Sequence, residues 1–154
     1  MSHLIRDERA TNRAAVEAFL NVFPEGGESF FAARQRMGLL APDYVMELPY
    51  APPGMRRRDT SEHHNARADW LRDVFLTWRR TNGPVIYETT DPKVFWVEAG
   101  GEGLTRFWGT PMPYLNDFAI MFVVEDGKVK LFREYFNPIN LYPPERIPRF
   151  PFGG

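Results

Sequence analysis

The chain contains no cysteine among its 154 residues, and this absence removes several kinds of chemistry at once. Disulfide bonds, thiolate zinc centres and cysteine nucleophiles all need the missing side chain. A protein without disulfides fits a reducing compartment, so the cysteine count agrees with a cytoplasmic location. The fold must then be held by its core, and 44 % apolar residues in one ordinary domain are enough to build it.

Serine is scarce, and long apolar runs are missing. None of the three serines, Ser2, Ser29 and Ser61, lies in a strand-turn-helix nucleophile elbow, so serine hydrolysis is not expected. No apolar stretch reaches the roughly 18 residues of a membrane-spanning helix, and the first residues lack the apolar run of a signal peptide. We therefore expect a cytoplasmic protein with no membrane partner.

The chain also lacks a strong charge and a phosphate-binding loop. A formal net charge of −1 gives no general attraction to nucleic acid, although Arg56-Arg57-Arg58 is a local basic run. We interpret that run as a solvated loop, with phosphate or carboxylate binding as the alternative. Gly100-Gly101-Glu102-Gly103 precedes no helix, so we interpret it as a connection between strands and not as a dinucleotide fingerprint. No cofactor is expected.

Helical periodicity marks the first half of the chain. It predicts a helix over residues 7–21, a short second helix that ends near Ala41-Pro42, and a third helix from about residue 59 that stops at Asn82-Gly83-Pro84. A short strand at 44–48 and a proline-rich loop at 49–54 separate the last two. The apolar stripes are Val16, Phe19, Leu20 and Phe23; Phe30, Ala33, Met37 and Leu40; and Ala66, Trp70, Leu71, Val74, Phe75 and Trp78.

Strand periodicity replaces helical periodicity in the second half of the chain. The period of two predicts strands over 85–89, 94–99, 104–108, 114–124 and 128–136. Helices followed by antiparallel strands indicate an α+β fold in which helices cover one side of a curved sheet. We expect one domain over 1–154, with a tail at 137–154 that holds five prolines. The aromatic residues of this tail, Tyr142, Phe150 and Phe152, suggest that it docks onto the body or onto a second subunit.

The most informative residue is Glu134. On a strand Phe132, Glu134 and Phe136 share one face, and a carboxylate between two phenylalanines needs an explanation. If that face is buried, desolvation raises the pKa of Glu134 toward neutrality, where a general acid or base works best. The alternative is that Lys128, Lys130 and Glu134 mark a solvated face.

The turn at Asp126-Gly127 decides what surrounds Glu134. A two-residue loop pairs Glu125 with Lys128 and places Ala119 opposite Glu134, whereas a three-residue loop with a bulged glycine pairs Val124 with Lys128 and places Phe118 there. We favour the bulged loop, because Gly127 then takes the left-handed conformation that glycine tolerates best. The face around Glu134 would then hold Tyr114, Asn116, Phe118, Ile120 and Phe122.

The third helix carries a second group of polar residues. His63 and His64 are adjacent, so they point about 100° apart and cannot bind one metal as an i, i+4 pair could. His63, Arg67 and Trp70 share a side of the helix. Either they are boundary residues of an amphipathic helix, or Arg67 and one histidine face Glu134 and suit an anionic substrate. The four tryptophans, with the phenylalanines, permit a pocket for a flat six-membered ring.

Three segments resemble the phenazine-biosynthesis A/B proteins, small bacterial enzymes with the conical fold of nuclear transport factor 2 and ketosteroid isomerase. The segments are Glu88–Glu98, Tyr114–Phe118 and Asp126–Asn137, and Asn12–Val16 is similar to the first-helix motif of the family. The resemblance implies an NTF2-like cone of three N-terminal helices on a curved, mostly antiparallel sheet, in a homodimer. In the family two molecules of an amino-cyclohexenone carboxylic acid are joined, amine to ketone, by acid/base catalysis.

The resemblance also assigns residues. It places the family's glutamate on Glu134 and its pocket tyrosine on Tyr114, but its helical histidine falls on Arg67, so His63, His64 or Arg67 would take that role. The candidate catalytic residues are therefore Glu134, His64 and His63, and the candidate substrate-binding residues are Tyr114, Arg67, Arg36 and Trp70. An isomerase, dehydratase or cyclase of the same fold, or a non-catalytic binding protein, remains the alternative function.

Overall fold

The structure is a computed structural model that describes residues 3–22, 24–149 and 151. Its elements are α1 (His3–Leu20), α2 (Phe30–Arg36), β1 (Leu40–Glu47), β2 (Arg58–Thr60), α3 (Ser61–Val74), β3 (Arg79–Glu88), β4 (Val94–Thr105), β5 (Met112–Glu125), β6 (Lys128–Phe136) and the short helices η1 (Pro138–Leu141) and η2 (Pro144–Arg146). Among these residues no helix is long and apolar enough to cross a bilayer.

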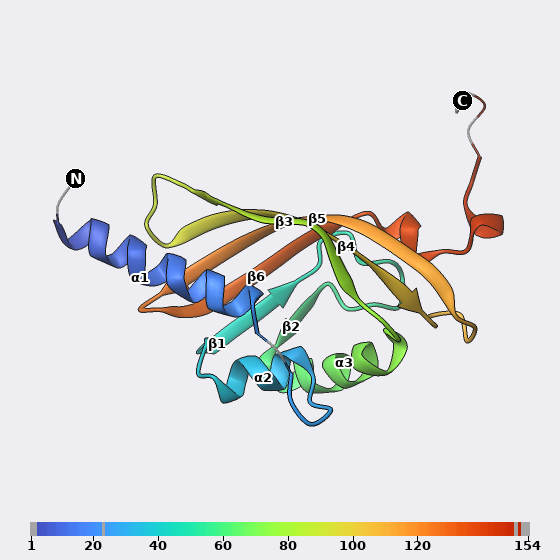
Figure 1. Cartoon of the computed structure of the whole chain (residues 1–154), viewed down its shortest axis with the longest axis horizontal. Helices are drawn as coiled ribbons and strands as arrows, with labels where there is room; N and C mark the ends of the chain where they lie inside the picture. The colour runs from blue at the N-terminus through green and yellow to red at the C-terminus, as the bar shows by residue number, and fades with distance from the viewer. Residues whose placement is uncertain (1–2, 23, 150, 152–154) are drawn as a thin grey trace.

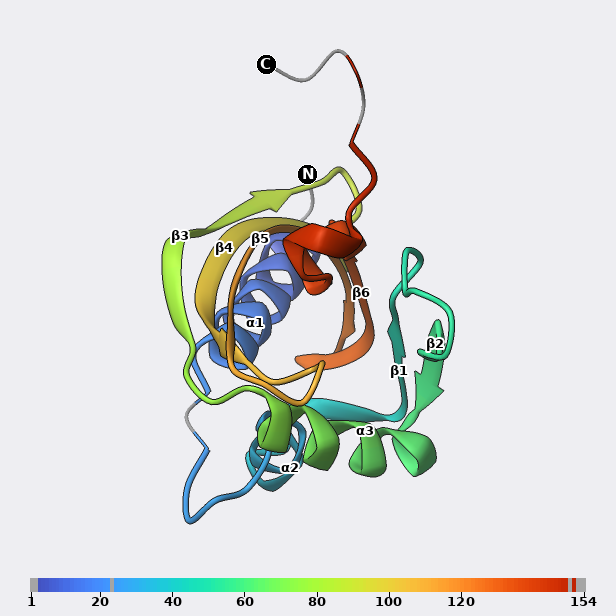
Figure 2. The ribbon, with the colours of Figure 1, turned by 90° about the vertical axis from the view of Figure 1, so that its right-hand side faces the viewer.

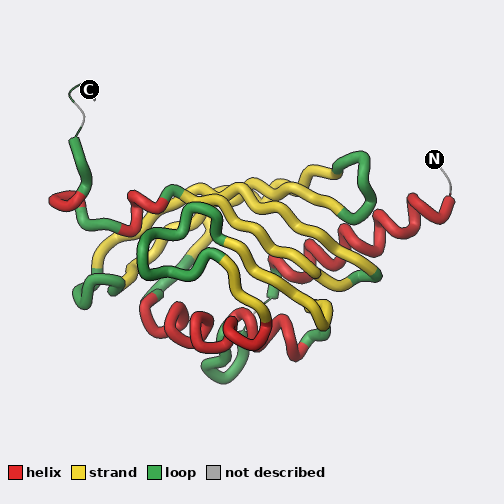
Figure 3. The backbone as a smooth tube through the Cα atoms, turned by 180° about the vertical axis from the view of Figure 1, so that it is seen from behind, coloured by secondary structure: helices red, strands yellow, loops and turns green. Residues whose placement is uncertain are grey.

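Six strands form one sheet in the order β2-β1-β6-β5-β4-β3. The pair β1–β6 is parallel, and the other four pairs are antiparallel. The sheet curves around α1, whereas α2 and α3 lie together beneath β1 and β2 (Figures 1 and 2). From behind, the strands cover one side and the helices the other (Figure 3). This α+β architecture confirms the expected fold class.

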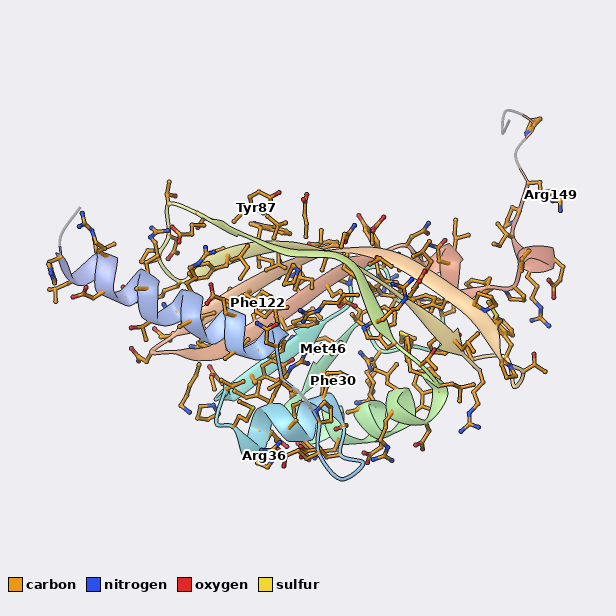
Figure 4. All side chains as sticks on the ribbon, viewed as in Figure 1. Phe30, Arg36, Met46, Tyr87, Phe122 and Arg149 are labelled. Atoms are coloured by element: carbon orange, nitrogen blue, oxygen red, sulfur yellow. The ribbon has the colours of Figure 1, made fainter. Side chains whose placement is uncertain are left out.

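The core lies between α1 and the centre of the sheet. The Phe19 ring of α1 meets Phe122 of β5 at 5.2 Å and Phe132 of β6 at 5.4 Å between ring centroids. Phe122 and Met46 point from the sheet toward the helices in Figure 4. Phe23, the last residue of the predicted α1 stripe, lies outside the described residues.

Helix α2 is rotated relative to the prediction. Phe31 and Ala33 are buried, whereas the predicted core residues Phe30 and Met37 are 48 % and 49 % exposed. Packing explains the rotation, because the Phe31 ring lies 6.0 Å from that of Tyr44 and 4.2 Å from that of His64, and this contact turns the side of Phe31 toward the core.

Helix α3 ends at Val74, well before the predicted stop at residues 82–84, which instead belong to β3. The chain leaves the helix because the sheet edge offers other partners. The Leu76 and Thr77 N–H groups both donate to the Leu104 carbonyl, at 2.8 and 3.3 Å. Apolar residues at 75 and 78 therefore continue the helical pattern in sequence but not in space.

The glycine run at 100–103 lies inside β4, so the predicted break between two strands there was wrong. Strand β4 pairs with β5 over its whole length. The glycines serve close approach: a Cβ on Gly101 would lie 2.0 Å from Cζ2 of Trp78, and one on Gly103 would lie 2.0 Å from the Thr77 carbonyl oxygen.

The β5–β6 hairpin combines features of both turn predictions. Asp126 and Gly127 have positive φ (51° and 72°), and Glu125 pairs with Lys128, so the loop has two residues and the favoured three-residue loop was wrong. The extra residue lies one step further, since the register shifts between Val124–Val129 and Val123–Leu131 and leaves Lys130 as a bulge. Ile120, not Phe118, lies opposite Glu134.

This bulge determines which residues of β5 share the face of Glu134. They are the even-numbered ones, as the favoured prediction had it, and Tyr114, Asn116, Ile120 and Phe122 are buried. The Lys130 ammonium holds the bulge through Glu125 at 3.0 Å and Asp43 at 3.3 Å.

The tail docks onto the body through Trp108. The Trp108 Nε1–H donates to the Leu141 carbonyl at 2.8 Å, and the Trp108 and Tyr142 rings lie 5.4 Å apart. This confirms the docking expected for Tyr142, whereas Phe150 and Phe152 lie outside the described residues.

Candidate functional site

Glu134 lies half-buried on the inner face of the sheet, between the buried Phe132 and Phe136 of β6 and opposite the buried Ile120 of β5. Burial raises the pKa of its carboxyl from 4.5 to about 7, and the nearby positive charge of Arg34 opposes this rise only in part. Within the described part of the chain, no hydrogen bond or ion pair to this carboxyl is present. Glu134 does not mark a solvated face, and near neutral pH its carboxyl is able both to give and to take a proton.

Arg34 on α2 is the cation that faces this acid, and the sequence interpretation missed it. Its guanidinium lies 3.7 Å above the Phe19 ring, and its Nε–H donates to the Phe19 carbonyl at 3.2 Å. Burial lowers its pKa to about 10, so it remains charged at neutral pH. The available signal was the helix phase, because Arg34 follows the buried Phe31 by three residues.

Arg36, the predicted substrate-binding arginine, is not part of this site. It projects from the outer side of α2 (Figure 4), is 44 % exposed at its side chain and pairs with Glu28 at 2.6 Å. Arg34 and Arg36 are separated by about 200° around the helix, so only one of them can face the sheet.

Two buried tyrosines complete the surroundings of Glu134. Tyr114 and Tyr44 are 5 % and 2 % exposed, and burial raises the pKa of each phenol above its ordinary value, with the charge of Glu134 acting in the same direction. The Tyr114 hydroxyl accepts a hydrogen bond from Asn116 Nδ2 at 3.0 Å, and Asn116 is held in turn by the backbone of Asn137. The structure thus brings Tyr114 to the acid as predicted, and adds Tyr44.

The two adjacent histidines of α3 lie in different environments. His64 is 5 % exposed, and its ring lies 4.2 Å from that of Phe31 and 5.9 Å from that of Tyr44. Burial lowers its pKa to about 4, so the imidazole is neutral at pH 7, and its Nδ1 has no hydrogen-bond partner among the described residues. His63 is exposed, and its Nδ1 lies 3.2 Å from the Thr60 hydroxyl.

Arg67 and Trp70 lie apart from Glu134. The Arg67 Nε lies 2.8 Å from Asp59 Oδ2, and its Nη2 donates to the Arg56 carbonyl, so this guanidinium is engaged with β2 and the loop before it. Trp70 is 44 % exposed and packs on Phe107. Of the candidate residues, Tyr114 shares the inner face with Glu134, and His64 contacts Tyr44, on whose phenol the charge of Glu134 also acts. In the described residues no group of three potential ligands could hold a metal ion.

The titration of Glu134 is expected to appear in the pH dependence of stability. The folded carboxyl keeps its proton up to about pH 7, whereas the unfolded one releases it near 4.5, so the stabilisation is full below pH 4.5 and is lost as the pH rises through 7. His64 acts oppositely, because its lowered pKa makes stability fall as the pH drops from 6.5 toward 4. Chemical denaturation of wild type and Glu134→Gln across this range isolates the first effect.

As the pH rises from acidic to slightly alkaline, we expect the free energy of unfolding of Glu134→Gln to increase by roughly 1–3 kcal/mol relative to that of the wild type. The amide of glutamine does not titrate in this range, so the variant does not lose this contribution to stability as the pH rises. A difference between the two proteins that does not change with pH would show that the Glu134 carboxyl titrates normally.

The curved sheet with an acid on its inner face defines an NTF2-like protein. An NTF2-like protein from Anabaena variabilis superposes with a TM-score of 0.62 over 89 % of this chain and 94 % of its own, at 22 % identity, which shows the fold alone. A crystal structure of a phenazine biosynthesis-related protein (phzb2) from Pseudomonas aeruginosa superposes with a TM-score of 0.76 over 97 % of both chains, at 26 % identity.

Comparison of the sequence with known proteins shows the family of this chain. The model of the family Phenazine biosynthesis protein A/B matches residues 7–144, and the chain therefore belongs to this family. It is 34 % identical over 133 residues to phenazine biosynthesis protein PhzB1 of Pseudomonas aeruginosa, covering 84 % of this chain and 76 % of that protein. It is 41 % identical to PhzA1 of the same species over 73 residues, which span 44 % of the length of that relative.

Proposed function

We propose that this protein is a cofactor-independent acid/base enzyme that condenses amino-cyclohexenone carboxylic acid units through imine formation and loss of water. The observation that carries the proposal is the Glu134 carboxyl, which has a pKa of about 7 and no protein partner among the described residues. Membership of the Phenazine biosynthesis protein A/B family supports this reaction class. The small-molecule substrate and the homodimer that the family resemblance implies are part of the same proposal.

A single carboxyl group can carry out both proton transfers of the dehydration step. The amine nitrogen of one substrate bonds to the ketone carbon of the other as the C=O π bond opens, and one of the two amine protons moves to the ketone oxygen, which becomes a hydroxyl. Protonated Glu134 donates to that hydroxyl, which leaves as water, and the resulting carboxylate takes the proton that nitrogen releases. The acid is thereby restored, so a pKa near the working pH suits both transfers.

Two neighbours support these steps. The Nε of Arg34 is bonded to Phe19, and the other nitrogens of its guanidinium have no hydrogen-bond partner among the described residues, so they are free to bind a substrate carboxylate. His64 is neutral at pH 7 and can hydrogen-bond the substrate without adding a second positive charge. We assign the role of the family's helical histidine to His64, because Arg67 is paired with Asp59 and His63 is exposed.

A direct assay tests the function. The protein is mixed with the amino-cyclohexenone carboxylic acid, and the condensed, dehydrated product is followed by mass spectrometry from about pH 5 to about pH 9. We expect acceleration over the spontaneous reaction and a rate that changes with an apparent pKa near 7. A rate equal to that in buffer at every pH would refute the proposal.

A further inference from the structure

A connected set of aromatic rings leads from the surface to Tyr114. Trp70 packs on Phe107 at 5.5 Å, Phe107 on Phe75 at 5.4 Å, and Phe75 on Trp78 at 5.5 Å between ring centroids. Trp78 in turn lies 6.0 Å from both Tyr114 and Phe118. We call this set the ring cluster: Trp70, Phe75, Trp78, Phe107, Tyr114 and Phe118. It occupies the end of the sheet where the α3–β3 connection meets the β4–β5 turn (Figure 2).

A groove of about 650 Å³ opens beside the ring cluster. Its lining includes Trp78 and Leu104 at the surface and Tyr114 at its inner side. Trp78 is 39 % exposed and Leu104 41 %, whereas Tyr114 is 5 % exposed. Tyr114 lies on the same face of β5 as Ile120, which pairs with Glu134, and the charge of Glu134 acts on the Tyr114 phenol, so the inner side of this groove leads toward the candidate site.

Trp78 is held in one place by its neighbours. The indole lies directly over Gly101, where any Cβ would overlap it, and the Phe75 ring meets it at an interplanar angle of 90°. A large ring that has a fixed orientation and is 39 % exposed can act as a stacking surface that loses little conformational freedom on binding. The glycine run of β4 thus provides the space for this tryptophan.

We propose that Trp78 is a specificity-determining residue: a flat, six-membered-ring carboxylic acid stacks on its accessible side in the groove and passes from there along Tyr114 to Glu134. The proposal rests on the proposed function for the substrate class. It adds the route of entry and the residue that selects planar rings.

Binding of a planar probe tests this role without turnover. Naphthoate, a flat ring acid, is titrated into wild type, Trp78→Leu and Trp96→Leu by calorimetry. Trp96 is the matched control, because it is 37 % exposed but stacks on Tyr135 at 6.1 Å, away from the groove. We expect Trp78→Leu to weaken binding about 2- to 10-fold, Trp78→Phe to retain most of it, and Trp96→Leu to leave it unchanged.

Two further measurements make the result decisive. If Trp78→Leu does not fold, the indole N–H resonance of Trp78 in the wild type answers the same question, because naphthoate in the groove must shift it more than the resonance of Trp96. Glu134→Gln should keep naphthoate binding at the groove even if turnover is absent, which separates this inference from the proposed function. Unchanged binding in Trp78→Leu, or an equal loss in Trp96→Leu, overturns the role of Trp78.

Discussion

Replacement of Glu134 by glutamine is expected to reduce the proposed turnover by about 10²- to 10⁴-fold, which is the usual contribution of a single general acid/base. The amide is nearly the same size as the carboxyl, so the packing between Phe132 and Phe136 is preserved. It cannot transfer a proton at neutral pH, however, and the dependence of the rate on a group with a pKa near 7 should disappear with it. The measurement is the initial rate of product formation, by mass spectrometry, as a function of pH.

The matched control for this variant is Glu98→Gln. Glu98 lies on β4, is exposed and accepts a hydrogen bond from the Tyr87 hydroxyl at 3.0 Å. The same chemical change at this surface should leave the rate within a factor of about two, since exposed substitutions of this kind have small effects. Equal rates for wild type and Glu134→Gln would exclude Glu134 as the catalytic acid and base.

The second large effect is expected at the buried ion pair of Asp59 and Arg67. The Asp59 carboxylate is 1 % exposed and the Arg67 side chain 9 %. Arg67→Met leaves Asp59 with Arg56 at 3.9 Å as its remaining ion-pair partner in the described structure. Removing one member of a buried pair costs about 3–5 kcal/mol of stability, because the other charge stays buried without adequate compensation. Denaturant unfolding at neutral pH measures this loss.

Arg72→Met is the control on the same helix. Arg72 is 41 % exposed at its side chain and contacts Asp69 and Asp73 at 3.2 Å each, so its loss should cost less than about 1 kcal/mol. The double variant Asp59→Leu with Arg67→Met should recover much of the stability, since an apolar pair removes both buried charges. If Arg67→Met is no less stable than Arg72→Met, the pair is better hydrated than the structure indicates.

Period-two patterning was enough to predict β6 and to place Glu134 on the face of Phe132 and Phe136, but it left open whether that face is buried. An acid between two phenylalanines is informative because hydrophobic burial of the strand fixes the position of the residue between them. Tyr114 and its face of β5 followed from the same argument once the bulge was assumed. The position of that bulge could not be predicted in this way, because an extra residue in the loop and an extra residue at Lys130 both turn the same residues of β5 inward.

The rest of the site depends on contacts between distant segments. Arg34 and Arg36 differ only in helix phase, and packing of Phe31 on Tyr44 and His64 determines which of them faces the sheet. Phe75 and Trp78 fit a helical stripe equally well, and their departure from α3 results from hydrogen bonds to Leu104. In isolation, Gly100, Gly101 and Gly103 indicate a turn. The structure needs small residues there because the indole of Trp78 packs over Gly101, and Trp78 lies more than twenty positions earlier in the chain.

The bulge at Lys130 also constrains how this hairpin can change in evolution. If Lys130 were paired in a regular ladder instead of bulged, Ala119 would oppose Glu134, and the acid would project from the convex side of the sheet into water. A single-residue insertion or deletion that the bulge does not absorb would therefore turn the acid outward, whereas loss of Lys130 itself would leave Ile120 opposite Glu134.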